Sequence, residues 1–356
     1  MVDEILDSVR EVLESGWLTM GPKVQLVEQT YSQLLKHNHV IAMNSCTAAL
    51  HIALRIAGIK KGSEVILPSN TFVATANSVL YNSGTPVFAE IQPDTMNLNP
   101  DDVENRISKN TRAIIVVHVA GLPCDMNAFV KIARDNDLIL IEDCAHAHGS
   151  MLDGKACGTF GDYSCFSFYP TKTISGAEGG LLIAPDDDSE SIARILLNHG
   201  RRGFGPEAIT EIGYNYRMNE LQAAVIIPQL SQLNEIVKKR IALAGKYNSE
   251  LSDVDGIELL KCPSNVRHSY YSYMVKLPVG SRTRIMKSLL NEGVETSIMY
   301  HPIHLCSVYR SKFGFSPGDF PITEESCSRI VSLPLHLGLT VKQIEFVCNL
   351  LRRELE

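Results

Sequence analysis

Short apolar runs alternate with segments of helical hydrophobic period along the first two thirds of the chain. The runs that predict buried strands are rich in β-branched and aliphatic residues and cover 40–43, 65–67, 86–89, 113–119 and 138–141. Strands that alternate with helices in sequence usually form a parallel sheet with helices on its faces. The pattern therefore predicts an α/β fold with a largely parallel sheet.

The pattern changes towards the C-terminus. Residues 226–251 have apolar positions at helical spacing, which predicts one long amphipathic helix whose buried face carries Ile227, Leu230, Leu233, Ile236, Val237 and Ile241. Beyond this helix the pattern is that of an α+β unit. We expect a large α/β domain over 1–228, which includes an N-terminal helix, and a smaller α+β domain over 229–356.

Composition narrows the kind of partner. The 356 residues are 45% hydrophobic and 21% charged, as in ordinary folded proteins, and the net charge of −7 offers no broad basic surface. Nucleic acid and anionic membranes are therefore not expected partners. The start of the chain lacks the features of a signal peptide, and the nine scattered cysteines suit a reducing compartment. We expect a cytoplasmic protein with a small-molecule ligand.

Residues that follow the predicted strands are candidates for a site, because ligands bind at the carboxyl ends of strands in such sheets. Ser45 and Thr47 precede a helix whose amides would favour a phosphate, although an N-cap is the simpler interpretation. Phe72 could cover a planar cofactor or belong to the core. Asp143 ends an apolar strand and needs a cationic or hydrogen-bonding partner, such as a protonated ring nitrogen or helix amides.

Two other motifs compete for this region. Residues 149–156 nearly match a phosphate-binding loop, but Ala156 lacks the required hydroxyl and the next residues resemble a turn and a strand. Cys144, His146, His148 and Cys157 could in principle bind zinc, but paired spacing typical of structural zinc sites is absent. We reject the first motif and expect no metal at the second.

Lys172 lies between an apolar run and the glycine pair that opens the next one. Loss of hydration there favours the neutral amine, a nucleophile that forms a Schiff base with an aldehyde. The ring of Phe72, the carboxylate of Asp143 and phosphate donors at Ser45, Thr47 and Ser167 complete the contacts that pyridoxal 5'-phosphate requires. The ordered set predicts this cofactor more strongly than any single member.

The chain also resembles a known family along nearly its whole length. The similarity runs through "SGWLTMGPKV", "NSCTAALHIAL", "PSNTFVATANSVL", "IEDCAHAHGS", "GDYSCFSFYPTKTISGAEGG", "GYNYRMNELQAA" and "SLPLHLGLT". These segments are similar to the DegT/DnrJ/StrS sugar aminotransferases, which have the aspartate aminotransferase fold, fold type I of the pyridoxal-phosphate enzymes. The resemblance implies a homodimer with shared active sites.

The resemblance also implies individual roles. Lys172 would bind the cofactor aldehyde, Asp143 would pair with the pyridine nitrogen, and His146 would lie near the ring hydroxyl. Phe72 would stack on the ring, while the phosphate would be held by Thr47, the Ala48 amide, Ser167 and, from the neighbouring subunit, Asn215. We further expect substrate contacts from Tyr216, Arg217, Tyr300 and His304.

The reaction implied is transfer of an amino group, from glutamate, through pyridoxamine 5'-phosphate to a nucleotide-linked keto sugar, such as a 4-keto-6-deoxy sugar. Three alternatives remain open: a sugar dehydratase, a cyclitol aminotransferase, and a non-enzymatic zinc-binding or sensory protein. Dehydratases of this family have histidine where this chain has Lys172, so the lysine favours transamination.

Overall fold

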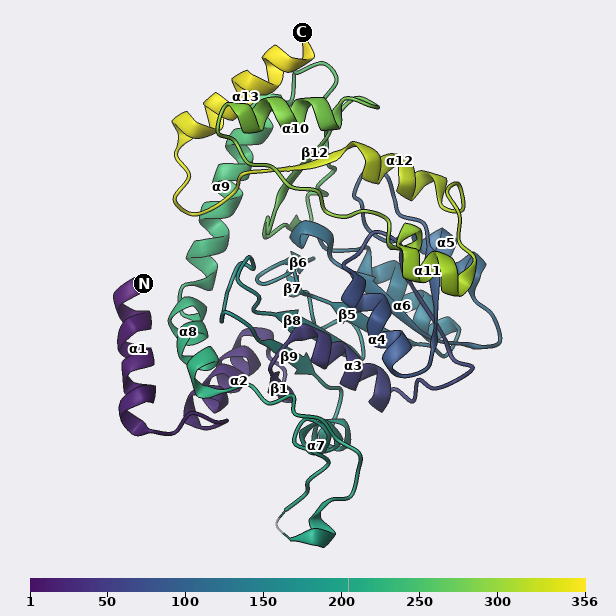
Figure 1. Cartoon of the computed structure of the whole chain (residues 1–356), viewed down its shortest axis with the longest axis vertical. Coiled ribbons are helices and arrows are strands. Elements are labelled where there is room, and N and C mark those ends of the chain that lie inside the picture. Colours follow the sequence, from purple (N-terminus) through teal and green to yellow (C-terminus); the bar gives the residue numbers. More distant parts are fainter. Residues whose placement is uncertain (204) are drawn as a thin grey trace.

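A mostly parallel sheet forms the centre of the larger part of the molecule (Figure 1). The computed structural model describes residues 1–203 and 205–356. Within them the sheet has the order β1-β9-β8-β5-β4-β2-β3, in which β9 alone runs antiparallel to its neighbours. Its strands are β1 (Val40–Met43), β2 (Glu64–Pro68), β3 (Thr85–Ala89), β4 (Thr111–Val117), β5 (Ile139–Asp143), β8 (Tyr163–Ser167) and β9 (Gly180–Ile183). The predicted α/β class is confirmed.

Helices cover both faces of this sheet, because successive strand residues point to opposite sides. Ile41 and Met43 of β1 pack with α3, α4 and α7, whereas Val40 and Ala42 pack with α2 and α8. Strands β2 to β5 bury their second face under α5 and α6. The helices are α1 (Val2–Ser15), α2 (Pro22–Leu35), α3 (Cys46–Ile56), α4 (Val73–Tyr81), α5 (Pro100–Arg106), α6 (Met126–Asp135), α7 (Asp187–Leu196) and α8 (Glu220–Leu230).

The C-terminal part is an α+β unit, as predicted. An antiparallel sheet of order β10-β12-β13 packs against α9, α10 and α13. Its elements are α9 (Leu233–Leu251), β10 (Glu258–Leu259), β12 (Tyr273–Lys276), α10 (Arg282–Asn291), α11 (Ser307–Phe313), α12 (Pro321–Arg329), β13 (Ile330–Leu333) and α13 (Val341–Leu355). Strand β11 (Val266–Arg267) instead joins a small hairpin of the larger part, β6 (Met151–Leu152) and β7 (Lys155–Ala156).

The single long helix predicted over 226–251 is wrong, because α8 ends at Leu230 and α9 begins at Leu233. Pro228 lies inside α8 and has no N–H to donate, which weakens the helix at this point. The Ser231 hydroxyl turns back to the Pro228 carbonyl at 2.8 Å, and the Gln232 amide donates to Gln229 in a tighter turn. The division of the chain after residue 228 remains a prediction.

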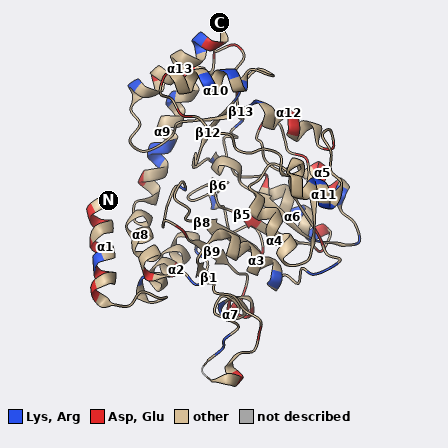
Figure 2. Ribbon diagram, in the orientation of Figure 1, with Lys and Arg blue, Asp and Glu red and all other residues tan. Residues whose placement is uncertain are grey.

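The motif at 149–156 forms the hairpin β6–β7 and no phosphate-binding helix, which confirms its rejection. In Figure 2, α13 carries both acidic and basic residues, whereas α1 carries mainly acidic ones. Of the helices described, none is both long and apolar enough to cross a membrane.

Candidate active site

A cavity of about 360 Å³ lies beyond the carboxyl ends of β4, β5 and β8. This is the place where ligands bind in sheets of this kind. Most of the residues predicted for the site line it, and they are Ser45, Thr47, Phe72, Asp143, His146, Ser167, Lys172 and Tyr300. The structure therefore brings together groups from positions 45 to 300 of the chain.

Asp143 is the last residue of β5 and is only 5% exposed. Its Oδ2 accepts a hydrogen bond from the Thr75 hydroxyl at 2.9 Å, and its Oδ1 accepts one from the Ala145 amide at 3.1 Å. Burial raises the pKa of Asp143 above its ordinary value, although these two hydrogen bonds and the charge of Lys172 oppose the rise. An ionised carboxylate can accept about four hydrogen bonds, so Asp143 keeps acceptor capacity towards the cavity.

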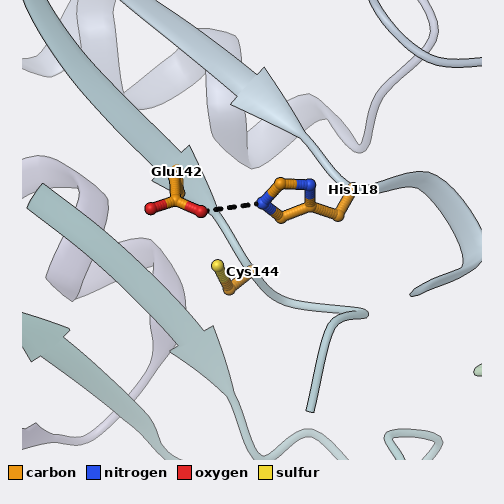
Figure 3. Close-up of side chains that lie close together, drawn as sticks. All are labelled: His118, Glu142 and Cys144. Carbon is orange, nitrogen blue, oxygen red and sulfur yellow. Dashed lines mark hydrogen bonds and ion pairs between the residues drawn. The ribbon is translucent and has the colours of Figure 1, made fainter. Parts of the chain in front are cut away.

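Glu142, the preceding residue, shows the contrast (Figure 3). Its carboxylate accepts from the amides of Gly158, Phe160 and Gly161 at 2.7–2.8 Å and lies 3.1 Å from His118 Nε2. Burial alone would raise the pKa of Glu142, but the bonds from His118 and from these amides leave it below the ordinary value. Glu142 is thus a fully satisfied structural carboxylate, while Asp143 faces the cavity.

Lys172 lies on the turn between β8 and β9, where its amide donates to the Tyr169 carbonyl at 2.9 Å. The side chain is half-buried and lines the cavity, and Nζ lies 4.6 Å from the centre of the Tyr271 ring. A primary amine in a partly dehydrated cavity, with a buried carboxylate nearby, is the arrangement that binds an aldehyde cofactor.

His146 is buried in the wall of the cavity, and its Nε2 lies 3.0 Å from the Tyr300 hydroxyl. Burial and the charge of Lys172 hold the pKa of His146 well below its ordinary value, so the ring is neutral. Its Nδ1 has no hydrogen-bond partner among the residues that the structure describes. A buried polar atom without a partner at a cavity wall suits contact with a polar group of a ligand.

The start of α3 provides the predicted phosphate side of the cavity. The Ser45 hydroxyl caps the helix by accepting from the Ala48 amide at 3.1 Å, so the N-cap interpretation of Ser45 is correct in this structure. Ser45 and Thr47 still line the cavity, and Ser167 faces it from the end of β8. A phosphate contact with the Ala48 amide stays a prediction.

Besides Ala48, four predicted residues lie outside the cavity of their own chain. Asn215 is exposed, and its carbonyl accepts from the Asn44 side chain at 3.1 Å. The Tyr216 hydroxyl lies 3.1 Å from His51 Nδ1, and Arg217 donates to Asn198 at 2.8 Å. His304 is fully buried, with its ring nitrogens next to Ser69 and Glu324, so within this chain it is a core histidine.

Sequence reasoning missed two members of the site. Thr75 holds Asp143, and its position one helical turn after Thr71 within "NTFVAT" was the available signal. Tyr271 reaches the cavity from the C-terminal unit, where it stacks on His146 with ring centres 4.2 Å apart. No local pattern distinguishes Tyr271 from its neighbours in "HSYYSY".

The proposed zinc ligands point to different partners. His146 faces Tyr300, His148 bonds to Tyr31 and to the Ser167 carbonyl, and Cys144 lies beside His118 and Glu142. Cys144, His118 and Glu142 lie close enough to approach one ion (Figure 3), but backbone amides already donate to the oxygens of Glu142. Cys144, His146 and His148, three residues of the zinc alternative, therefore do not form one site.

The groups present fit pyridoxal phosphate. Lys172 offers an amine for its aldehyde, Asp143 offers an anionic acceptor for its ring nitrogen, and His146 offers an unpartnered Nδ1 for its ring hydroxyl. The fold and the site together define a pyridoxal-phosphate-dependent aminotransferase of the aspartate aminotransferase fold.

Residues 1–352 match the model of the DegT/DnrJ/EryC1/StrS aminotransferase family, and the chain belongs to this family. It is 33% identical to the spore coat polysaccharide biosynthesis protein SpsC of Bacillus subtilis over 98% of this chain and 94% of SpsC. The structure of DesI in the presence of its TDP-sugar product is 31% identical, with a TM-score of 0.91, 99% of this chain and 90% of DesI being covered.

The structure of Spr1654 of Streptococcus pneumoniae, named a putative sugar aminotransferase, is also similar to this chain. Its PLP form is 26% identical to this chain, with a TM-score of 0.95 over 99% of this chain and 96% of Spr1654. The same protein is also known in a PMP form. The family resemblance inferred from the motifs and the cofactor inferred from Lys172 are both confirmed.

We predict that the purified protein is yellow and that Lys172→Ala abolishes both the absorbance of the lysine-bound cofactor and turnover, because no other amine replaces Nζ. Absorbance spectra and a transamination assay measure both. Lys155→Ala, an exposed lysine on β7, is the control and should keep both signals. Retention of both signals in Lys172→Ala would contradict the role of this lysine.

Proposed function

We propose that the protein transfers the amino group of glutamate to a keto sugar linked to a nucleoside diphosphate, with a 4-keto-6-deoxy sugar as the acceptor. The observation that carries this proposal is the Lys172 amine in the cavity with Asp143 and His146. The acceptor class is supported by DesI, whose structure contains a TDP-sugar product, and by the polysaccharide biosynthesis name of SpsC. Glutamate as donor rests on the family resemblance.

The cofactor, once bound, supplies an electron sink and carries the amino group between the two substrates. Asp143, at the cavity wall, would pair with the ring nitrogen of the bound cofactor and would keep that nitrogen protonated. Lys172 Nζ takes the proton from the α-carbon of the donor and later returns one to the carbon that receives nitrogen. His146, neutral and oriented by Tyr300, accepts or donates a hydrogen bond at Nδ1.

The aromatic groups at the mouth restrict access by water. Phe72 is 58% exposed at the start of α4, with its ring 6.0 Å from that of Tyr300. Its position supports the expected stacking on a flat cofactor, since the exposed ring has room to adjust to it. The Tyr300 amide donates to the Asn70 side chain at 3.2 Å. In this position Tyr300 would contact the substrate.

Dehydration is the second candidate reaction, and the lysine at position 172 argues against it within the family resemblance. A cyclitol acceptor presents its ketone on an all-carbon ring and lacks the nucleoside diphosphate. We also propose the cytoplasm as the location, because the nine cysteines are unpaired in the structure, as expected in a reducing compartment.

We further propose a homodimer in which Asn215 completes the cavity of the other subunit. Asn215 is exposed and outside its own cavity, which leaves its side chain available to a partner. Tyr216 and Arg217 follow it on the same segment and would contact substrate in the partner's cavity. A two-fold axis would make both shared sites equivalent.

The substrate proposal predicts that glutamate and a nucleotide-linked 4-keto-6-deoxy sugar give equal amounts of 2-oxoglutarate and an amino sugar. Enzyme-coupled detection of 2-oxoglutarate and mass spectrometry of the sugar measure the two products. Reactions without acceptor or with Lys172→Ala are the controls. Release of 2-oxoglutarate with a cyclitol ketone alone, or loss of a sugar hydroxyl without amination, would replace the proposal by the corresponding alternative.

The shared-site proposal predicts complementation between inactive variants. Lys172→Ala and Asn215→Asp, whose carboxylate would repel the phosphate, should each be nearly inactive as homodimers. After random reassortment of equal amounts, half of the dimers are mixed and each has one intact site, so about a quarter of wild-type sites should return. If subunit exchange is verified by differently tagged chains and no activity returns, Asn215 does not act across the interface.

A further inference from the structure

Tyr271 contacts Lys172 and also the residue before it, Thr171. Its ring lies under the amine, with Nζ 4.6 Å from the ring centre, and its hydroxyl lies 2.9 Å from Oγ1 of Thr171, the residue before the lysine. The same ring stacks on His146 at an interplanar angle of 16°. One side chain of the C-terminal unit thus touches both the amine and the neutral histidine of the cavity.

The backbone around Tyr271 is held in an unusual conformation. Tyr270 has a φ of 49°, in the left-handed region that is strained for a residue with a side chain. On the large-domain side, the Ser269 hydroxyl bonds to that of Ser150 at 2.8 Å. A strained backbone conformation persists only where surrounding contacts fix it. Contacts other than that of Ser269 must therefore also hold the turn at Tyr270.

Arg240 of α9 is that second support. It is 8% exposed, and its guanidinium donates to the carbonyls of Tyr270 at 2.8 Å, Tyr271 at 2.7 Å and Leu335 at 3.2 Å. Burial lowers the pKa of Arg240 to about 10, which still leaves it charged at neutral pH. Burying a cation that donates its hydrogen bonds to carbonyls costs free energy. The bonds from Arg240 to residues 270 and 271 therefore suggest that holding this turn has a functional role.

We propose that Tyr271 is the positioning residue of the Lys172 amine, holding Nζ over its ring whenever the amine is free of the cofactor, and that Arg240 fixes Tyr271 for this task. The inference rests on the proposed role of Lys172 and not on the identity of the sugar. It assigns the C-terminal unit a part in the proton transfers of the large domain.

The physical basis is the attraction between an ammonium group and the negative face of an aromatic ring. When the cofactor carries the amino group as pyridoxamine phosphate, the lysine amine is free, and the long lysine side chain can adopt several rotamers. A ring that attracts its charged form keeps Nζ near the reacting carbon. The bond to Thr171 fixes the direction of the ring, and Tyr271→Phe removes that bond alone.

The first test measures acylation of Lys172 by an activated acetate ester in the full-length enzyme loaded with pyridoxamine phosphate. Peptide mass spectrometry compares Lys172 with exposed Lys60 in the same sample. Because the ring holds Nζ in one position against its face, Tyr271→Leu should free the amine and raise the relative rate about 10-fold, and Tyr271→Phe should stay within about 2-fold of wild type.

Leucine also opens the cavity, so a second series keeps the ring and removes its charge distribution. A phenylalanine with three ring fluorines at position 271 has nearly the shape of phenylalanine but a much weaker negative face. It should approach the acylation rate of Tyr271→Leu. Equal rates for phenylalanine and its fluorinated form would overturn the electrostatic role, because steric shielding predicts that equality.

Arg240→Met should raise Lys172 acylation in the same direction as Tyr271→Leu, although residue 240 does not touch the lysine. Lys239→Met, which changes an exposed neighbour on α9, is the matched control and should leave the rate unchanged. Binding of pyridoxamine phosphate, checked by absorbance, confirms that each variant is folded. If Arg240→Met binds cofactor and acylates like wild type, Arg240 does not position Tyr271.

The inference and the proposed function fail separately. The acylation series needs neither donor nor acceptor, so a wrong sugar leaves its result intact. If Lys172→Ala kept the absorbance of the lysine-bound cofactor, the role of the lysine would fall before the series began. If Lys172→Ala loses that absorbance but phenylalanine and its fluorinated form at position 271 give equal acylation rates, only the role of Tyr271 is rejected.

Discussion

A carboxylate buried at the end of a parallel strand is the constraint on which the site depends. Asp143 is almost inaccessible, yet among the described residues only Thr75 and Ala145 donate hydrogen bonds to it. An ionised group in such a place is stabilised by positive charge nearby, which Lys172 and the ring nitrogen of a bound pyridinium would supply. Strand β5 lies between β8 and β4, so Asp143 at its end is flanked by two strands and faces the cavity.

The two neighbouring carboxylates have different surroundings because of the geometry of their strand. Glu142 and Asp143 are consecutive residues of one strand and therefore point to opposite faces. Glu142 is saturated by backbone amides and His118, which ties the loop 158–161 to the sheet. Asp143 is left with free acceptor positions, so only one of the pair can serve a ligand.

Much of this arrangement could be predicted from the sequence, because the large domain is built from local signals. Apolar runs locate the strands, and in a parallel sheet the residues after them meet at one edge. That rule was enough to bring Ser45, Phe72 and Asp143 to one cavity with Lys172. The family resemblance then supplied the individual roles, which the pattern alone left open between a cap and a phosphate site.

The rest depends on contacts between distant segments. Tyr271 lines the cavity and Arg240 of α9 donates to its carbonyl, and no local pattern encodes that contact. His304 was expected near substrate, yet it is buried between Ser69 and Glu324, which are 235 and 20 residues away in sequence. The break between α8 and α9 follows Pro228, and the apolar period from which the helix was predicted does not reveal it.

The most direct test of the account is Asp143→Asn, which keeps the shape of the side chain and removes its charge. We expect the variant to bind cofactor but to lose about 10² or more in the rate of amino transfer from glutamate, measured in single turnover, because the ring nitrogen loses its anionic partner. Glu142→Gln is the matched control, expected to lower the melting temperature without that loss of rate. An unchanged rate in Asp143→Asn would show that this carboxylate is structural and would contradict the account.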